Sequence, residues 1–193
     1  LPRVPHGYWR TQPLVVRLEH GPFAGMRVHV RKHGSGPPLL LLHGLMTSSY
    51  SWRYVLEPLG ERFTCFAPDL PGNGRSDRPL GPSYEPANLA GWLAELQRAL
   101  GVRGCPVIAN SMGGYVAFAL LRRYRARVLG LALLDTRAEP DSPEGRRGRL
   151  ESAERVVSEG NGFMIEATVA RLLAPRTRTE LPDRKNGAEL MVR

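Results

Sequence analysis

The sequence of 193 residues has only two cysteines, two lysines and no long apolar run. Cys65 and Cys105 are too few and too far apart for a disulfide framework or a metal-ligand spacing, so we expect two small buried residues and no metal site. The apolar run at residues 39–42, like every other apolar run of the sequence, is too short to cross a bilayer. Residues 1–6 lack the apolar run of a secretion signal, and we therefore expect a cytoplasmic protein with no membrane partner.

The net charge of +9 comes almost wholly from arginine, because Lys32 and Lys185 are the only lysines. A basic balance can indicate nucleic-acid binding. The arginines are spread along the chain, with the densest groups at residues 122–127 and 146–149, and no basic helix with interleaved aromatic residues is visible. This distribution favours a solvated surface over a nucleic-acid partner.

Short apolar segments alternate with segments of helical periodicity as far as residue 134. Alternating residues at 14–19 and 26–31 predict two antiparallel strands joined by a turn, and in the second of these His29 is expected to face solvent. The apolar runs 38–42, 63–67, 106–109 and 128–134 predict further strands, and the spacing in 48–60, 89–100 and 115–123 predicts helices between them. The expected fold class is α/β, with a doubly wound, mainly parallel sheet.

Ser111 follows one of these predicted strands and precedes a predicted helix, within Ala109-Asn110-Ser111-Met112-Gly113-Gly114. A serine at such a junction occupies a strained turn that pushes its hydroxyl out of the sheet, and small neighbours allow the helix to stay close to the strand. Alanine stands at position 109 where glycine is usual. The pattern predicts that Ser111 is a catalytic nucleophile.

A second turn, His43-Gly44-Leu45-Met46, ends the strand expected beside the Ser111 strand. Acyl transfer requires two preorganised backbone N–H groups for the oxyanion. The N–H groups of Leu45 and Met112, each just after a turn, are the predicted donors. His43 and Gly44 are assigned to the substrate-binding side of the site, with the His43 ring expected to organise the loop rather than to abstract a proton.

The glycine-containing loop 69–77 could indicate a dinucleotide fingerprint, but it lacks the third glycine, and Pro79 follows where a helix would have to begin. No cofactor is therefore expected.

Three segments, 42–44, 69–77 and 110–114, resemble the α/β-hydrolase fold superfamily in its single-domain esterase, lactonase and carbon–carbon hydrolase branch. They occur in the family's order and at its approximate spacing. The resemblance implies that Asp69 and Arg75 form a structural turn near the site. It also implies a small-molecule substrate, and it leaves the identity of that substrate and the oligomeric state open.

The resemblance further implies a triad in the order Ser, then Asp or Glu, then His. Asp135 is the candidate acid, although an ordinary strand-end aspartate is the favoured interpretation. All five histidines, at positions 6, 20, 29, 33 and 43, precede Ser111. We therefore expect a C-terminally truncated member that lacks the last strands, with a hydrolase core at 1–135, a helical cap segment at 136–175 and a poorly patterned tail at 176–193.

Two functions from different classes remain. The first is a serine hydrolase for an ester, lactone or related acyl bond, present here as an inactive or weakly active fragment without the catalytic histidine. The second is a non-catalytic binding or interaction protein that keeps the hydrolase fold. A basic nucleic-acid binder is a third and weaker possibility.

Overall fold

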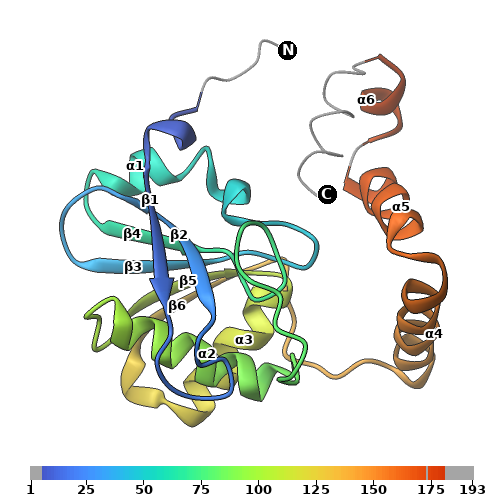
Figure 1. The fold of residues 1–193 in the computed structure, drawn as a ribbon. Helices are drawn as coiled ribbons and strands as arrows, with labels where there is room; N and C mark the ends of the chain where they lie inside the picture. Colours follow the sequence, from blue (N-terminus) through green and yellow to red (C-terminus); the bar gives the residue numbers. More distant parts are fainter. Residues whose placement is uncertain (1–5, 173, 181–193) are drawn as a thin grey trace. The chain divides into compact units, whose positions relative to one another are not determined.

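The computed structural model describes residues 6–172 and 174–180. The chain divides into two compact units, Leu1–Arg137 and Ala138–Arg193 (Figure 1). All segments predicted to carry chemistry belong to the first unit.

The first unit is built on a six-stranded sheet in the order β1-β2-β4-β3-β5-β6. The strands β3, β4, β5 and β6 run parallel, whereas β1 and β2 form an antiparallel pair and β2 joins β4 antiparallel. Their bounds are Gln12–Arg17, Arg27–His33, Pro38–Leu42, Thr64–Pro68, Cys105–Asn110 and Val128–Leu134, from β1 to β6. Within the described residues β6 forms one edge of the sheet, and the predicted α/β fold class is confirmed.

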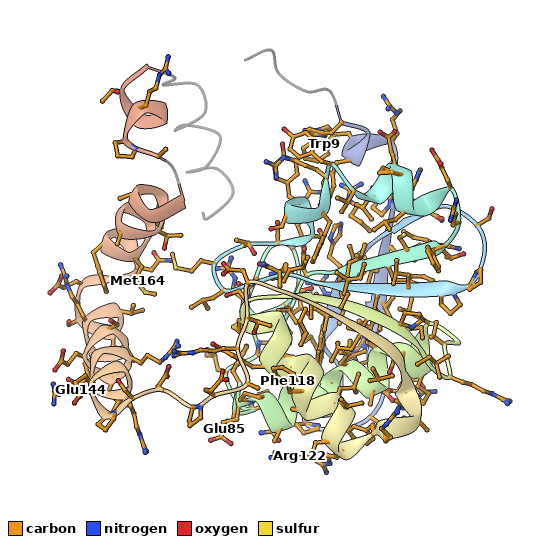
Figure 2. All side chains as sticks on the ribbon, turned by 180° about the vertical axis from the view of Figure 1, so that it is seen from behind. Trp9, Glu85, Phe118, Arg122, Glu144 and Met164 are labelled. Atoms are coloured by element: carbon orange, nitrogen blue, oxygen red, sulfur yellow. The ribbon has the colours of Figure 1, made fainter. Side chains whose placement is uncertain are left out.

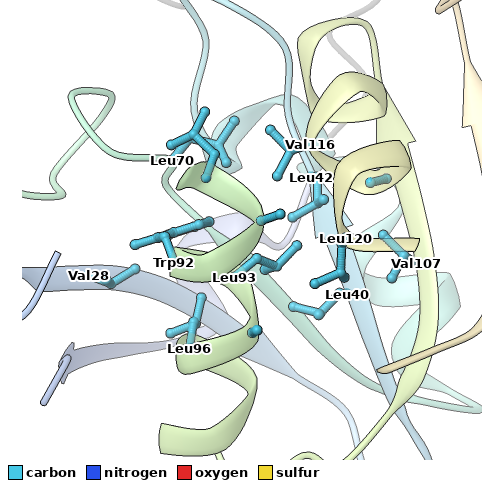
Figure 3. Packing of buried hydrophobic residues seen from close by; sticks show 14 of the residues in the cluster. Val28, Leu40, Leu42, Leu70, Trp92, Leu93, Leu96, Val107, Val116 and Leu120 are labelled. Atoms are coloured by element: carbon cyan, nitrogen blue, oxygen red, sulfur yellow. The ribbon is translucent and has the colours of Figure 1, made fainter. Parts of the chain in front are cut away.

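Helices cover both faces of this sheet. The larger core lies under α2 (Pro86–Ala99) and α3 (Met112–Arg123), where Leu93 and Leu120 pack against Leu40 and Val107 (Figure 3). The smaller core lies under the short helices η1 (Tyr8–Arg10), η2 (Ser49–Trp52) and α1 (Leu56–Gly60). A run of leucines in β3 serves both cores, because successive side chains of a strand point to opposite faces.

The arginine-rich segment after α3, which includes η3 (Arg125–Arg127), lies at the surface. Arg122, Arg123 and Arg125 are exposed, and Figure 2 shows Arg122 projecting outward from α3. These side chains match the solvated surface expected from the sequence.

The prediction of one helix at 48–60 was wrong, because the structure has two short helices, η2 and α1, in its place. Pro58 explains the break. A proline in a continuous helix would lack one hydrogen bond and would clash with the carbonyl group four residues earlier, at Tyr54. Val55, which the single helix would have placed on the apolar face, is exposed instead.

His29 is buried, with 6% of its surface exposed, so the prediction that it faces solvent was also wrong. The loop that follows β4 covers this part of β2. The His29 backbone accepts a hydrogen bond from Asp69 N and donates one to Ser76 Oγ. Local alternation in β2 carries no information about a loop 40 residues away, which explains the error.

The second unit contains three helices in its described part, α4 (Pro143–Glu159), α5 (Gly162–Leu172) and α6 (Pro175–Glu180). Ser142 caps α4 by accepting a hydrogen bond from Gly145 N, as its position before Pro143 indicates. The assignment of this region as a cap segment stays a prediction. The expected tail at 176–193 begins within α6, and its residues 181–193 lie outside the described residues. None of the described helices is long and apolar enough to cross a membrane.

Candidate active site

Ser111 occupies the junction between β5 and α3 with a φ of 49° and a ψ of −118°. A positive φ in a non-glycine residue costs on the order of 1–3 kcal/mol and persists only where the surroundings impose it. The half-buried Ser111 side chain does not cap the helix that it precedes. Ser111 directly precedes the N-terminus of α3, where the helix dipole favours negative charge.

Two glycines allow α3 to approach the sheet behind Ser111. A methyl group on Gly113 would lie 2.6 Å from the carbonyl oxygen of Leu42 and 2.8 Å from that of His43. Both contacts are to backbone atoms, which cannot move aside. Because residue 113 is glycine, the start of α3 can pack directly against the end of β3.

The His43–Gly44 turn packs on Ser111 from the β3 side. A methyl group on Gly44 would lie 3.2 Å from Ser111 Cβ and 3.1 Å from Asn110 Oδ1. Of the next two residues, Leu45 is exposed and Met46 has a φ of 57°. The structure thus brings together the two turns that carry the predicted oxyanion donors, the N–H groups of Leu45 and Met112.

The His43 ring is fully buried beneath this turn. Its Nε2 accepts a hydrogen bond from Leu70 N at 2.9 Å, so its Nδ1 carries the proton and donates to the Gly44 carbonyl at 2.8 Å. Burial lowers the pKa of His43, which keeps the ring neutral, as these contacts require. Both ring nitrogens therefore support the loop, in agreement with the expectation that His43 organises it.

Asp69, in the loop after β4, stabilises the end of the segment that begins with the His43–Gly44 turn, through a hydrogen bond from Ser49 N. Its carboxylate accepts hydrogen bonds from Ser49 N at 2.7 Å, Arg75 N at 2.9 Å and His29 Nδ1 at 3.1 Å. Burial alone would raise the pKa of Asp69, but hydrogen bonds from His29, Arg75 and Ser49 outweigh it and lower the pKa from 3.8 to about 2. The carboxylate is therefore ionised at neutral pH and holds three separate segments together. These contacts fit the structural role for the 69–77 loop that the family resemblance implies.

The structure brings no histidine of the described residues into hydrogen bonding with Ser111. His29 is bonded to Asp69 and His43 to its own loop, while His6 contacts Tyr50 Oη at 3.1 Å. Asp135 follows β6 with a φ of 46° and an exposed side chain. Among the described residues, the two turns predicted to carry the nucleophile and the oxyanion donors therefore lie together with no histidine bonded to Ser111.

The contacts of the turn after β6 were not predicted from the sequence. The Leu134 carbonyl accepts hydrogen bonds from Ser111 N at 3.0 Å and from Asn110 Nδ2 at 3.2 Å. The Thr136 hydroxyl donates to the Ser111 carbonyl at 2.9 Å. No sequence pattern identifies these contacts, although strand adjacency places the end of β6 beside the end of β5.

Comparison with known proteins decides the family. The profile of the α/β-hydrolase fold matches residues 37–185. The chain belongs to the α/β-hydrolase fold family. This family assignment agrees with the sheet order and with the Ser111 turn at the carboxyl end of β5.

Several relatives are similar to this chain over part of their length. A soluble epoxide hydrolase of Corynebacterium sp. (strain C12) is 41% identical over 58% of this chain and 38% of its own length. A haloalkane dehalogenase of Sphingobium indicum is 32% identical over 81% of this chain and 57% of its own length. A thermophilic esterase from Thermogutta terrifontis superposes with a TM-score of 0.82 and 36% identity, over 94% of this chain and 66% of that one. The chain therefore spans only part of the length of each of these proteins.

Proposed function

We propose that this α/β-hydrolase chain carries the nucleophile and the oxyanion donors of a serine hydrolase site, but not its base. Ser111 is the proposed nucleophile, and a small ester, lactone or related acyl compound is the proposed substrate. The observation that carries the proposal is the strained Ser111 turn, with φ at 49°, packed against the His43–Gly44 turn. A strained turn of this kind between a strand and a helix is typical of a nucleophilic serine, because it exposes the hydroxyl at the edge of the sheet.

In the proposed reaction Ser111 Oγ attacks the carbonyl carbon while its proton passes to a base. The carbonyl oxygen becomes an oxyanion, which the N–H groups of Leu45 and Met112 stabilise. Collapse of the tetrahedral intermediate expels the alcohol and leaves an acyl group on Ser111, and water then releases the acid. Gly44 leaves room for the acyl carbon beside Ser111, whereas the buried His43 ring contributes by holding the turn.

The chemistry of a serine nucleophile selects among the activities named for the relatives. Attack by a serine hydroxyl on an alkyl halide or an epoxide would give an ether, which water does not hydrolyse under mild conditions. Attack on an ester gives an acyl-serine, which water does hydrolyse. The presence of Ser111 therefore supports an esterase-like reaction, the activity named for the Thermogutta terrifontis relative.

The 193-residue chain has no histidine after Ser111. A hydroxyl without an imidazole base loses several orders of magnitude in rate, so we propose that this chain turns over slowly or not at all. Asp135 stays the candidate acid of the triad. The acid acts by orienting the catalytic histidine, so Asp135 would have no catalytic effect in a chain without that histidine.

Fluorophosphonate labelling with added imidazole tests the proposal. Imidazole in the buffer replaces the missing base, so the labelling rate of the wild-type chain should rise with imidazole concentration, and a Ser111→Ala variant should stay at background. Rapid labelling without imidazole would contradict the proposed low activity. Equal labelling of the two proteins under all conditions would contradict Ser111 as the nucleophile.

A non-catalytic binding protein is the second candidate, and the position of every histidine before Ser111 favours it. Such a protein would bind a small acyl compound in the same place without acylation. Binding of an ester measured by calorimetry, together with no acyl transfer to Ser111 in the presence of imidazole, would favour this candidate over the hydrolase.

A further inference from the structure

The Ser111 backbone is held from the β6 side by a turn made of residues 134–136. The Leu134 carbonyl accepts the Ser111 N–H at 3.0 Å, and the Thr136 hydroxyl donates to the Ser111 carbonyl at 2.9 Å. Both polar groups of the Ser111 main chain are therefore bonded to this one turn.

The 134–136 turn can reach back to Ser111 because of its own backbone. Asp135 has a φ of 46°, the left-handed conformation that aspartate tolerates better than most residues. This conformation lets Leu134 and Thr136, on either side of it, both contact Ser111. Asp135 thus contributes its backbone to the site whether or not its carboxylate does.

Thr136 also fills a space that Gly114 leaves open. A methyl group on Gly114 would lie 2.4 Å from Thr136 Oγ1, 2.7 Å from Cγ2 and 2.8 Å from Cβ. Thr136 is therefore packed against the first turn of α3 as well as hydrogen-bonded to Ser111. Gly114 N donates to the same Ser111 carbonyl at 2.9 Å, so that this oxygen accepts two hydrogen bonds.

We propose that Thr136 is a positioning residue for the nucleophile: its hydroxyl fixes the peptide between Ser111 and Met112. That peptide carries the Met112 N–H, one of the two proposed oxyanion donors. A small rotation of it would move both the Ser111 hydroxyl and this donor. The inference rests on the proposed function for its catalytic consequence, but the contact itself can be tested separately.

The test compares the wild-type chain with Thr136→Val, which keeps the shape and removes the hydroxyl, and with Thr136→Ser, which keeps the hydroxyl. The first measurement is fluorophosphonate labelling of Ser111 with imidazole present. The second is amide hydrogen exchange of Ser111 by nuclear magnetic resonance, with the Leu93 amide in α2 as an internal reference.

Thr136→Val should slow labelling about tenfold, the rate equivalent of one neutral hydrogen bond, and should speed exchange at Ser111 by a similar factor. Exchange at Leu93 should not change, and Thr136→Ser should stay within about twofold of the wild type in both measurements. Unchanged labelling and unchanged Ser111 exchange in Thr136→Val would overturn the proposal. Equal acceleration at Ser111 and Leu93 would also overturn it, because it would show a general loss of stability.

If the wild-type chain does not label even with imidazole, the proposed function fails. The exchange measurement then still decides whether Thr136 positions the Ser111 backbone, so the two failures can be distinguished.

Discussion

The Ser111 turn and the Asp69 loop flank the His43–Gly44 turn, and different interactions hold them in place. Ser111 is fixed by neutral hydrogen bonds to the 134–136 turn and by glycines that permit backbone contact. Asp69 is fixed by a buried carboxylate that accepts three hydrogen bonds. The contacts that hold the Ser111 turn are uncharged and do not depend on pH, whereas the charge that holds the Asp69 loop does.

The largest effect is expected from Gly113→Ala, which tests the steric side. The added methyl group meets two carbonyl oxygens at less than 3 Å, so the free energy of unfolding should fall by about 3 kcal/mol. Gly91→Ala in α2 is the matched control, because its methyl group would meet only Tyr124 Oη, at 3.8 Å. This control should be neutral or stabilising by up to about 1 kcal/mol. Urea unfolding of the two variants measures both effects, and equal stabilities would contradict the steric account.

Asp69→Asn tests the charged side and should have the next largest effect. At pH 7 the free energy of unfolding should fall by about 2 kcal/mol, because both carboxylate oxygens of Asp69 accept hydrogen bonds, whereas asparagine has only one accepting oxygen. Asp77→Asn is the control, since Asp77 pairs with Arg27 at the surface and its removal should cost less than about 1 kcal/mol. Similar losses in the two variants would argue against a special role for Asp69.

The pH dependence of stability sharpens the same prediction. The pKa of Asp69 is about 2 in the folded protein and lies near 3.8 when the residue is unperturbed. A depressed pKa contributes stability that is fully present above pH 4 and is lost as the pH falls from about 4 to about 2. In this window the wild-type chain should lose stability more steeply than Asp69→Asn. Parallel curves from urea unfolding at pH 7, 4 and 3 would show that Asp69 is not the group concerned.

The smallest expected effect is a gain from Ser111→Gly. Glycine adopts a φ of 49° without a steric penalty, so this variant should unfold with a free energy about 1 kcal/mol higher than that of the wild type. It should also lose all labelling by fluorophosphonate. A variant that is less stable than the wild type would show that Ser111 is not strained. Thermal unfolding by calorimetry is sensitive enough to give the sign.

The sequence predicted the parts of the fold that depend on local pattern. The strand at 128–134 was predicted at its observed bounds, and Ser111 was placed correctly between a strand and a helix. Apolar runs and glycines record such features directly, because each reflects the conformation or burial of the same residues. The prediction that Ser111 is a nucleophile stays a prediction.

The remaining features depend on contacts between distant segments. His29 was expected to face solvent but is covered by the loop after β4, and Thr136 gave no signal although it bonds to the Ser111 backbone. The single helix expected at 48–60 was wrong for a different reason. The apolar spacing over these residues favours one helix, but the ring of Pro58 interrupts it, and two short helices form instead.

Mass spectrometry of the 193-residue chain after incubation with an activated acetate ester tests the central claim most directly. If Ser111 is a nucleophile in a chain without its own base, imidazole should promote acetylation of the peptide that contains Ser111, and Ser111→Ala should remove that signal. The acetyl group should persist once imidazole is removed, because hydrolysis of the acyl-serine needs a base as well. Acetylation confined to other residues, or none with imidazole present, would contradict the account.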